Sequence, residues 1–393
     1  MNPIHRTAPW SGWLTASAAT VVLSGCAPER DTRRPLLAGE RLTPVGFVEL
    51  TAQVDAIRVE ADIPGLSLGL VERGELVWAV GLGTRDVLND QPVEASTPFL
   101  TASVSKTVVA VAAARVASAG RLDLDAPVDD LLEGAYRHPD GSPYSLRQLL
   151  THTAGIVDDW DTLADGYVVG DAEQPLEAWV ADYFLPEGAL YDAHHNFAPD
   201  GPGQARVYSN AGIALAAVVV AEAAGVPFDD WCEAELFGPM GLADTGWHLA
   251  DLDVEQVALP HVRTSAGPLP IPHYGVPDWP DGQLRASAVD LSLLVASLTE
   301  PAAHPSGTLD LLFEVPFPDI DDRQALAWSK RNRAGRTGMW THGGSEMGAA
   351  AEVVLDAETA DAVVVLANTD KDTTTTEALR AVAELAFASL TIP

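Results

Sequence analysis

The strand-forming segments of this chain lie at its two ends, with mainly helical sequence between them. Near the first end, alternating leucines at 66–70, a turn at 72–75 and a returning apolar run at 76–80 predict a β-hairpin. Near the other end, 349–355 and 362–367 are two more β-type runs. If all four runs share one sheet, that sheet is antiparallel. We therefore predict an α+β fold, with an antiparallel sheet flanked by helices and an inserted, mainly helical lobe.

Helical periodicity predicts three segments outside that lobe or at its border. Residues 45–62 place apolar side chains on one helical face, residues 103–119 are rich in alanine and valine and end at Gly120, and residues 374–390 form a last helix. Residues 257–282 are rich in proline, so we expect an irregular excursion there.

The chain is strongly acidic. Its 393 residues include 56 acidic and 23 basic side chains, a formal net charge of −33. Such a surface repels phosphate backbones and anionic membranes, so we expect no nucleic-acid partner. Apolar residues make up 47% of the chain, ample for a globular core, and no run of 18 or more apolar residues follows the first 26 positions. Any membrane contact is therefore expected only through the N-terminal segment.

The N-terminal segment is typical of an export signal. Residues 1–26 combine a weakly basic front, an apolar stretch at 13–23 and the ending Leu23-Ser-Gly-Cys26. That ending resembles the lipobox of bacterial lipoproteins, in which the cysteine is lipidated and becomes the new N-terminus. We expect residues 27–44 to be a tether and the protein to be exported and anchored in the cell envelope through Cys26. An ordinary cleaved signal with an incidental cysteine is the alternative.

Cys232 is the second of two cysteines. Lipidation or removal of the first leaves no partner for an intramolecular disulfide. The neighbouring Trp231 and Leu236 predict a buried, inert thiol.

The chain has three lysines, Lys106, Lys330 and Lys371, and the first stands three places after Ser103. Positions i and i+3 share a helical face, so the Lys106 amine can reach the Ser103 hydroxyl. A serine hydroxyl is a weak nucleophile until a base takes its proton, and burial can lower the pKa of a lysine enough for that task. A capping serine beside a solvated lysine is the plain alternative, but the apolar flanks of the pair argue against it. The pair predicts covalent hydrolysis.

Two later segments carry compatible chemistry. Tyr208 and Asn210 stand in a Tyr-Ser-Asn sequence, where a nearby ammonium would make the tyrosine a usable general base and the amide could hold a substrate carbonyl. The glycine-rich segment 340–348 contains His342, and its backbone edge could offer an N–H to an oxyanion. Taken singly, the first is as easily a loop tyrosine and the second a turn that leads into a strand.

Together, Ser103-x-x-Lys106, Tyr208-x-Asn210 and His342-Gly-Gly344 resemble the three motifs of the serine β-lactamase and penicillin-binding-protein superfamily. The resemblance is to the branch with tyrosine in the second motif, namely class C β-lactamases, D-alanyl-D-alanine carboxypeptidases and related esterases. Five other segments look like that family's framework: Ile63-Pro-Gly65, Gly120-Arg-Leu-Asp-Leu-Asp-Ala-Pro-Val128, Leu149-Leu-Thr-His-Thr-Ala-Gly155, Pro239-Met-Gly-Leu-Ala-Asp-Thr245 and Ser287-Ala-Val-Asp-Leu291.

The resemblance covers residues 45–390 and implies one catalytic domain. Its α/β lobe is expected at about 45–120 and 300–390 and its helical lobe at about 121–299, with the active site in the cleft. The family implies a small-molecule or peptide acyl substrate, no cofactor and no metal. It leaves the oligomeric state open.

The first two motifs carry over position by position. Ser103 matches the family's acylated nucleophile, and Lys106 matches its lysine partner. Tyr208 matches the base that activates the serine and later the hydrolytic water. Asn210 matches the amide that orients the substrate.

The third motif departs from the family pattern. His342-Gly-Gly344 replaces Lys-Thr-Gly, so the threonine hydroxyl is missing, and a histidine is only partly charged near neutral pH. Gly344 and Ser345 still match the substrate-binding strand, and the N–H groups of Ser103 and Ser345 are implied to form the oxyanion hole. Arg336-Thr-Gly338 is a decoy, because the spacing to the following strand fits the histidine segment instead.

The departure favours one of three functions. We expect an esterase or D-amino-acid peptidase type of hydrolase that works through a Ser103 acyl-enzyme on a small ester, amide or peptide. A class C-like β-lactamase or D,D-carboxypeptidase acting on β-lactams or cell-wall peptide is the alternative. A non-catalytic surface lipoprotein is a third interpretation.

Three other polar groups are weaker candidates. His152 is expected to be a structural residue at a helix start, and His194-His195 a loop without metal-ligand spacing. Asp158-Asp-Trp160 either lines the mouth of the cleft or forms a solvated loop with one packed tryptophan.

Lipidation of Cys26 is testable in cells. If the lipobox is used, a metabolically incorporated fatty-acid analogue will label the protein, and Cys26→Ala will abolish the label because the thiol that carries the lipid is gone. The measurement is in-gel detection of the analogue after immunoprecipitation. Equal labelling of both forms would defeat the hypothesis.

Overall fold

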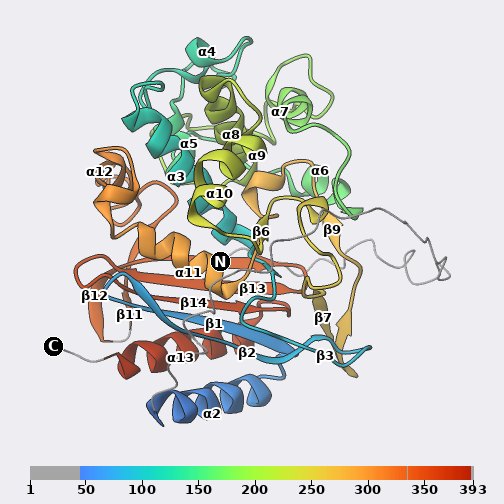
Figure 1. Cartoon of the computed structure of the whole chain (residues 1–393). Helices are drawn as coiled ribbons and strands as arrows, with labels where there is room; N and C mark the ends of the chain where they lie inside the picture. The colour runs from blue at the N-terminus through green and yellow to red at the C-terminus, as the bar shows by residue number, and fades with distance from the viewer. Residues whose placement is uncertain (1–44, 334, 391–393) are drawn as a thin grey trace. The chain divides into compact units, whose positions relative to one another are not determined.

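The strands from the two ends of the chain form one sheet. The computed structural model describes residues 45–333 and 335–390, so the predicted signal peptide, tether and Cys26 lie outside the described residues. Seven strands pair antiparallel in the order β11-β12-β13-β14-β1-β2-β3 (Figure 1). Their bounds are β1 Gly65–Glu72, β2 Glu75–Asp86, β3 Gln91–Pro92, β11 Ser329–Arg333, β12 Arg336–Glu346, β13 Ala349–Asp356 and β14 Asp361–Ala367. The predicted fold class is confirmed.

The two ends of the chain meet along β1. Leu68 pairs with Val80 of β2 on one side and with Val365 of β14 on the other. The predicted hairpin turn is made by Arg73 and Gly74, both with positive φ, a conformation that glycine adopts without strain. Because β1 needs hydrogen bonds on both edges, the N-terminal hairpin and the C-terminal strands complete each other.

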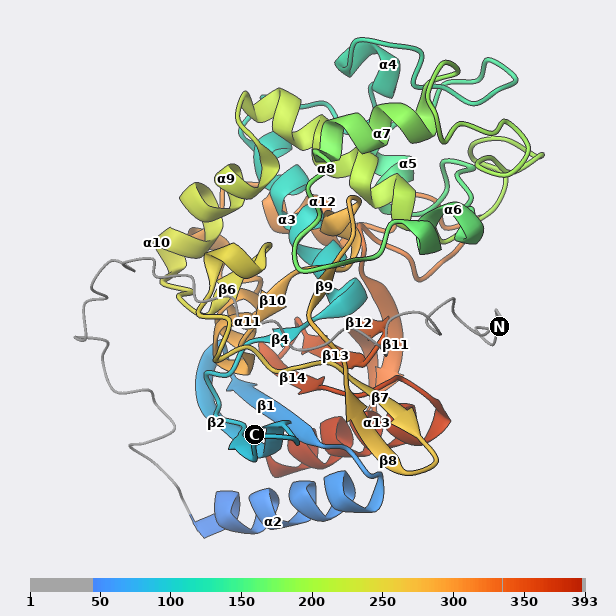
Figure 2. The same cartoon turned by 90° about the vertical axis from the view of Figure 1, so that its right-hand side faces the viewer.

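Helices cover both faces of the sheet. Helices α2 (Val45–Glu60) and α13 (Thr373–Ser389) lie side by side beneath it (Figures 1 and 2), and their apolar residues share a core with one face of the strands. Helix α11 (Ala288–Ser297) packs on the opposite face, against β1, β2 and β14. The sheet is therefore buried on both sides, which explains the nearly continuous apolar runs in β1 and β14.

The middle of the chain forms the helical lobe. Its helices are α3 Ser105–Ser118, α4 Val128–Leu131, α5 Leu146–Leu150, α6 Trp160–Asp165, α7 Leu176–Phe184, α8 Asn210–Ala224, α9 Phe228–Cys232, α10 Gly238–Met240 and α12 Thr308–Phe313. Short turns of 3-10 or π helix are η2 Ala102–Val104, η3 Glu233–Phe237, η4 Leu249–Asp251, η5 Trp279–Asp281 and η6 Pro301–Ala303. Helix α8 is the centre of the lobe, in contact with α3, α5 and α7.

No single helix in the described part of the chain is long and apolar enough to cross a membrane, although α8 and the segment Phe228–Met240 could do so as a bent pair by length and composition alone.

At the borders between the lobes, two helices pack in a different lobe from the one that their position in the sequence predicts. Helix α3, expected in the α/β lobe, packs against α8 and α12 in the helical lobe, whereas α11 lies on the sheet. Seven short strands form three small antiparallel sheets besides the main one. The first has the order β4 (Phe99–Leu100), β10 (Arg285–Ala286) and β6 (Thr245–Gly246). The other two pair β5 (Val168–Val169) with β9 (Tyr274–Gly275), and β7 (His261–Thr264) with β8 (Gly267–Pro270). The proline-rich stretch 257–282 is thus partly ordered by β7, β8, β9 and η5.

Close packing of α11 on β1 depends on Gly69. A Cβ there would clash with the Ser292 hydroxyl and come within 2.7 Å of the Ala288 carbonyl oxygen. We expect Gly69→Ala to lower the free energy of unfolding by about 1–3 kcal/mol, because overpacking forces a shift in a closely packed interior. Urea denaturation measures this loss.

Ser292→Ala is the matched control for this clash. The Ser292 hydroxyl is buried and makes no hydrogen bond, so its removal should restore part of the stability lost in Gly69→Ala. If Gly69→Ala alone leaves the free energy of unfolding unchanged, α11 can move away from β1 without loss of stability.

Candidate active site

Ser103 lies in the turn that connects the short strand β4 to α3. It belongs to η2, directly before α3, rather than to the first turn of the α-helix itself. The turn is held from both sides: Thr101 donates its N–H and its hydroxyl to the Leu284 carbonyl, and Ser105 donates its hydroxyl to the Ala102 carbonyl at 2.6 Å. Ala102 has φ +50°, a strained value for a residue with a side chain. The nucleophile candidate is therefore held at a sharp bend and stays partly exposed.

Lys106 is fully buried beside Ser103. Its Nζ donates to the Ser103 Oγ at 3.2 Å and to the Asp281 carbonyl oxygen at 2.6 Å, and lies 3.9 Å from the Asp281 carboxylate. Burial lowers the pKa of Lys106, but the electrostatic effect of its neighbours Tyr208 and Asp281 outweighs burial, so the pKa is raised. The expectation of a lysine with a lowered pKa is wrong, because burial here comes together with acidic neighbours.

Acidic groups surround the one buried ammonium. Asp158, Asp278 and Asp281 are buried, and Glu346 is partly buried at the end of β12. Burial raises the pKa of each of these carboxyl groups, that of Asp281 to about 7 despite the opposing charge of Lys106. Glu346 accepts from the Tyr167 hydroxyl at 2.7 Å. Asp278 and Asp281 stand in no recognisable motif, and Glu346 lies in the segment 340–348 but was not singled out from the sequence.

Tyr208 and Asn210 flank the start of α8. Lys106 Nζ lies 5.1 Å from the centre of the Tyr208 ring, and Tyr208 is 38% exposed. The tyrosine is thus next to the ammonium and open to the cleft. The structure brings together the residues of the first and second motifs.

Asp158 fixes the segment that carries these residues. Its carboxylate accepts from the Ser209 hydroxyl at 2.9 Å and from the Asn210 N–H at 2.8 Å. The position at a helix N-terminus suits a negative charge. Asp158 therefore anchors α8 from within, whereas the sequence suggested a place at the mouth of the cleft or in a solvated loop; Trp160 is the exposed member of that segment.

The third motif lies on β12, close to the nucleophile. Gly344 is pressed against η2: a Cβ there would clash with the Thr101 carbonyl oxygen and lie 3.1 Å from the Ala102 Cβ. Only glycine permits this approach. Ser345, the next residue, is exposed, so this part of β12 is open to solvent beside η2.

His342 is neutral in this environment. Burial and the charge of Lys106 lower its pKa to about 3, and its Nδ1 lies 3.1 Å from the Gly343 carbonyl oxygen. The expectation of a partly charged histidine is therefore wrong. Gly343 leaves room for Lys371, whose Nζ would lie 2.8 Å from a Cβ at this position. The threonine of the family pattern does not fit here without displacing that lysine.

The weaker candidates lie elsewhere or serve the fold. His152 is buried and follows the end of α5, so it does not start a helix. His194 and His195 are exposed, and the described residues contain no group of three or more His, Cys, Asp or Glu that could hold a metal ion. Cys232 is buried, which raises its pKa.

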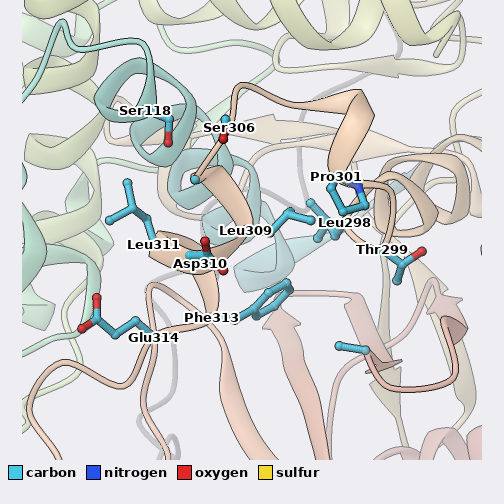
Figure 3. A pocket seen from close by; sticks show the side chains of 12 residues that line it. Ser118, Leu298, Thr299, Pro301, Ser306, Leu309, Asp310, Leu311, Phe313 and Glu314 are labelled. Carbon is cyan, nitrogen blue, oxygen red and sulfur yellow. The ribbon is translucent and has the colours of Figure 1, made fainter.

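A hollow of about 940 Å³ lies apart from these residues (Figure 3). It is lined by residues of α12 and of the ends of α3 and α11, among them Ser118, Leu298 and Phe313. None of its lining residues belongs to the three motifs, so the hollow takes no part in the chemistry of Ser103 and its neighbours.

Comparison with known proteins agrees with the arrangement. A family model described as Beta-lactamase matches residues 49–387. Esterase EstB of Burkholderia gladioli is 29% identical over 283 residues, which cover 68% of this chain and 68% of the esterase. The solved structure of EstCE1, a hydrolase with promiscuous acyltransferase activity, has a TM-score of 0.71 and 20% identity over 87% of this chain and 99% of that chain. D-amino acid amidase from Ochrobactrum anthropi SV3, complexed with D-phenylalanine, has a TM-score of 0.69 and 19% identity, over 87% and 98%.

The neutral state of His342 has a measurable consequence. Between pH 5 and 8 it does not titrate in the folded protein, so we expect His342→Gln to leave the pH limbs of kcat/KM in place. In the unfolded chain this histidine has an ordinary pKa near 6.5, so below that pH only the unfolded chain binds the proton. Acidification from pH 8 to 5 should therefore lower the free energy of unfolding of the wild type by about 1–2 kcal/mol more than that of the variant. Thermal melts at the two pH values measure the difference.

The exposed His195 supplies the control, since His195→Gln should change neither measurement. Loss of a pH limb in His342→Gln alone would show that His342 titrates during turnover.

Proposed function

This chain belongs to the beta-lactamase family and is a serine hydrolase of that family, and from this premise we propose that it works through a Ser103 acyl-enzyme on a small ester, amide or peptide. The observation that carries the proposal is the hydrogen bond from the Lys106 Nζ to the Ser103 Oγ at 3.2 Å, together with the Tyr208 ring, whose centre lies 5.1 Å from the same Nζ. The candidate nucleophile Ser103, the ammonium of Lys106 and the exposed candidate base Tyr208 therefore lie next to one another.

In the acylation step, the Ser103 Oγ attacks the substrate carbonyl carbon and its proton passes to the Tyr208 oxygen. Lys106 keeps its proton, because its pKa is raised, and its charge favours the phenolate that accepts the serine proton. The tetrahedral oxyanion is stabilised by the backbone N–H groups of Ser103 and Ser345. It then collapses as the bond to the leaving group breaks, and Tyr208 returns the proton to the leaving oxygen or nitrogen.

In the deacylation step, a water molecule takes the place of the leaving group. Tyr208 accepts a proton from the water as its oxygen attacks the acyl carbon, and the bond to Ser103 breaks with return of the proton to the Ser103 Oγ. Asn210 orients the acyl chain during both steps. The products are a carboxylic acid and free enzyme, so each turnover consumes one water.

Three observations favour an esterase-type substrate over a β-lactam. The third motif holds a neutral His342 where a lysine would attract a substrate carboxylate. Lys371 fills the space that a threonine at 343 would need. The chain as a whole is strongly acidic, with a formal net charge of −33, and such a charge disfavours an anionic substrate. Esterase EstB is a relative with matching coverage, and the β-lactamase or D,D-carboxypeptidase alternative lacks a comparable feature in the cleft.

We further propose that the enzyme acts outside the cytoplasm, in the cell envelope, held by a lipid on Cys26. The support is the sequence ending Leu23-Ser-Gly-Cys26 and the tether-like composition that follows it.

Intact-mass spectrometry of protein that starts after Cys26 tests the proposed chemistry. With a p-nitrophenyl ester, we expect rapid turnover that falls at least 1,000-fold in Ser103→Ala, because the acyl-accepting oxygen is gone. With a penicillin, we expect neither turnover nor a persistent adduct. Product absorbance gives the rate, and the mass of the protein shows any acyl group.

Ser118→Ala, a substitution of a serine far from the motifs, is the matched control and should retain full activity. A penicilloyl adduct or penicillin turnover that depends on Ser103 would move the assignment to a β-lactamase or cell-wall peptidase. Absence of any Ser103-dependent acylation by esters, amides or penicillins would support the non-catalytic lipoprotein instead.

A further inference from the structure

His152 lies directly beneath the candidate base. It is 2% exposed, and its ring centre is 4.3 Å from that of Tyr208, with the two rings tilted by 35°. It has φ +60°, an unusual value for a bulky residue. Backbone strain of this kind persists only where surrounding contacts hold it. His152 donates its own N–H to the Leu149 carbonyl oxygen at 3.1 Å, at the end of α5, and its other hydrogen bonds lead to the segment around Tyr208.

Hydrogen bonds join His152 to both neighbours of Tyr208. The Val207 N–H donates to the His152 carbonyl oxygen at 2.7 Å, and the Ser209 N–H donates to its Nδ1 at 3.3 Å. The tyrosine is therefore bracketed on either side by bonds to a single residue, while the imidazole supports its ring from below. These contacts restrict both the backbone and the ring of Tyr208, the residue proposed to accept the proton of Ser103.

The protonation state of His152 suits this role. Burial lowers its pKa well below the ordinary value, and the charges of Arg206 and Lys106 lower it further, so the ring stays neutral. A neutral ring keeps the Nδ1 lone pair free to accept from Ser209, which places the proton on Nε2. A charged ring would lose that acceptor and repel Lys106. The groups that face the ring are Arg206, Lys106, His342 and Tyr208.

We propose that His152 is a positioning residue for Tyr208: its carbonyl, its Nδ1 and its ring together hold the phenol oxygen where it can exchange a proton with Ser103. The inference rests on the proposed function, because it assumes that Tyr208 is the base. It adds a residue that lies 56 positions earlier in the chain and that touches no reacting atom. Its effect is exerted wholly through the tyrosine.

His152→Asn separates the ring from the other contacts. Asparagine tolerates positive φ better than other residues with a side chain, and its Oδ1 can accept from Ser209 in place of Nδ1. The variant thus keeps the backbone and the acceptor but leaves the Tyr208 ring unsupported. We expect kcat for a p-nitrophenyl ester to fall about 10- to 100-fold with little change in KM, since a misplacement of about 1 Å in a catalytic group has effects of that size.

A double-mutant cycle with Tyr208→Phe is the decisive experiment. If His152 acts through Tyr208, His152→Asn will lower kcat in the wild type but cause less than a twofold further loss in the Tyr208→Phe background. Leu146→Ala, which removes a buried side chain from the other end of α5, is the control for general destabilisation. It should lower Tm at least as much as His152→Asn and leave kcat at 25 °C within about twofold of the wild type.

The outcomes separate the two hypotheses. A large loss in Tyr208→Phe combined with an equal loss from His152→Asn in both backgrounds, or with no loss from His152→Asn at all, would overturn the positioning role and leave the base assignment intact. Full activity in Tyr208→Phe would instead overturn the proposed mechanism.

Discussion

The buried ammonium of Lys106 is the interaction on which the site depends. A charge without water around it must be matched by nearby acceptors, and here these are the Ser103 hydroxyl, the Asp281 carbonyl and the acidic side chains around them. Ser103 and Lys106 belong to η2 and α3, whereas Asp281 belongs to η5, far along the chain. Satisfying one charge therefore fixes the relative positions of segments that the sequence keeps apart.

Close approach of the sheet to the nucleophile is the second constraint. Gly344 has no side chain to keep β12 away from Thr101, so the part of β12 that bears Ser345 can lie beside η2, the turn that carries Ser103. Gly343 does a different task on the same strand, since it leaves space for Lys371. The two glycines of the motif therefore have different neighbours: Gly344 faces the backbone of Thr101, and Gly343 faces the end of the Lys371 side chain.

The ionisable side chains around Lys106 determine the electrostatics of the candidate site. At this site the pKa of Lys106 is raised by its acidic neighbours, and the pKa values of Asp278 and Asp281 are raised by burial and, for Asp278, by repulsion between the two carboxyl groups. Tyr208 is the exposed member of this set, and it is held by Asp158 and His152 through the residues on either side of it. The base candidate is therefore the accessible group, and the lysine beside it is a buried group whose pKa is raised.

The sequence by itself determined the hairpin at 66–80, the strands at 349–355 and 362–367, and the order of the three motifs, because alternation of apolar residues and short fixed spacings are local signals. It also identified the family, through motifs read in order. Only the tertiary structure decided that the pKa of Lys106 is raised, that His342 is neutral, and that Asp281, Asp158 and His152 lie against the residues of the motifs. Those properties arise from burial and from neighbours distant in the chain, and no local pattern encodes the electric field that a folded interior creates.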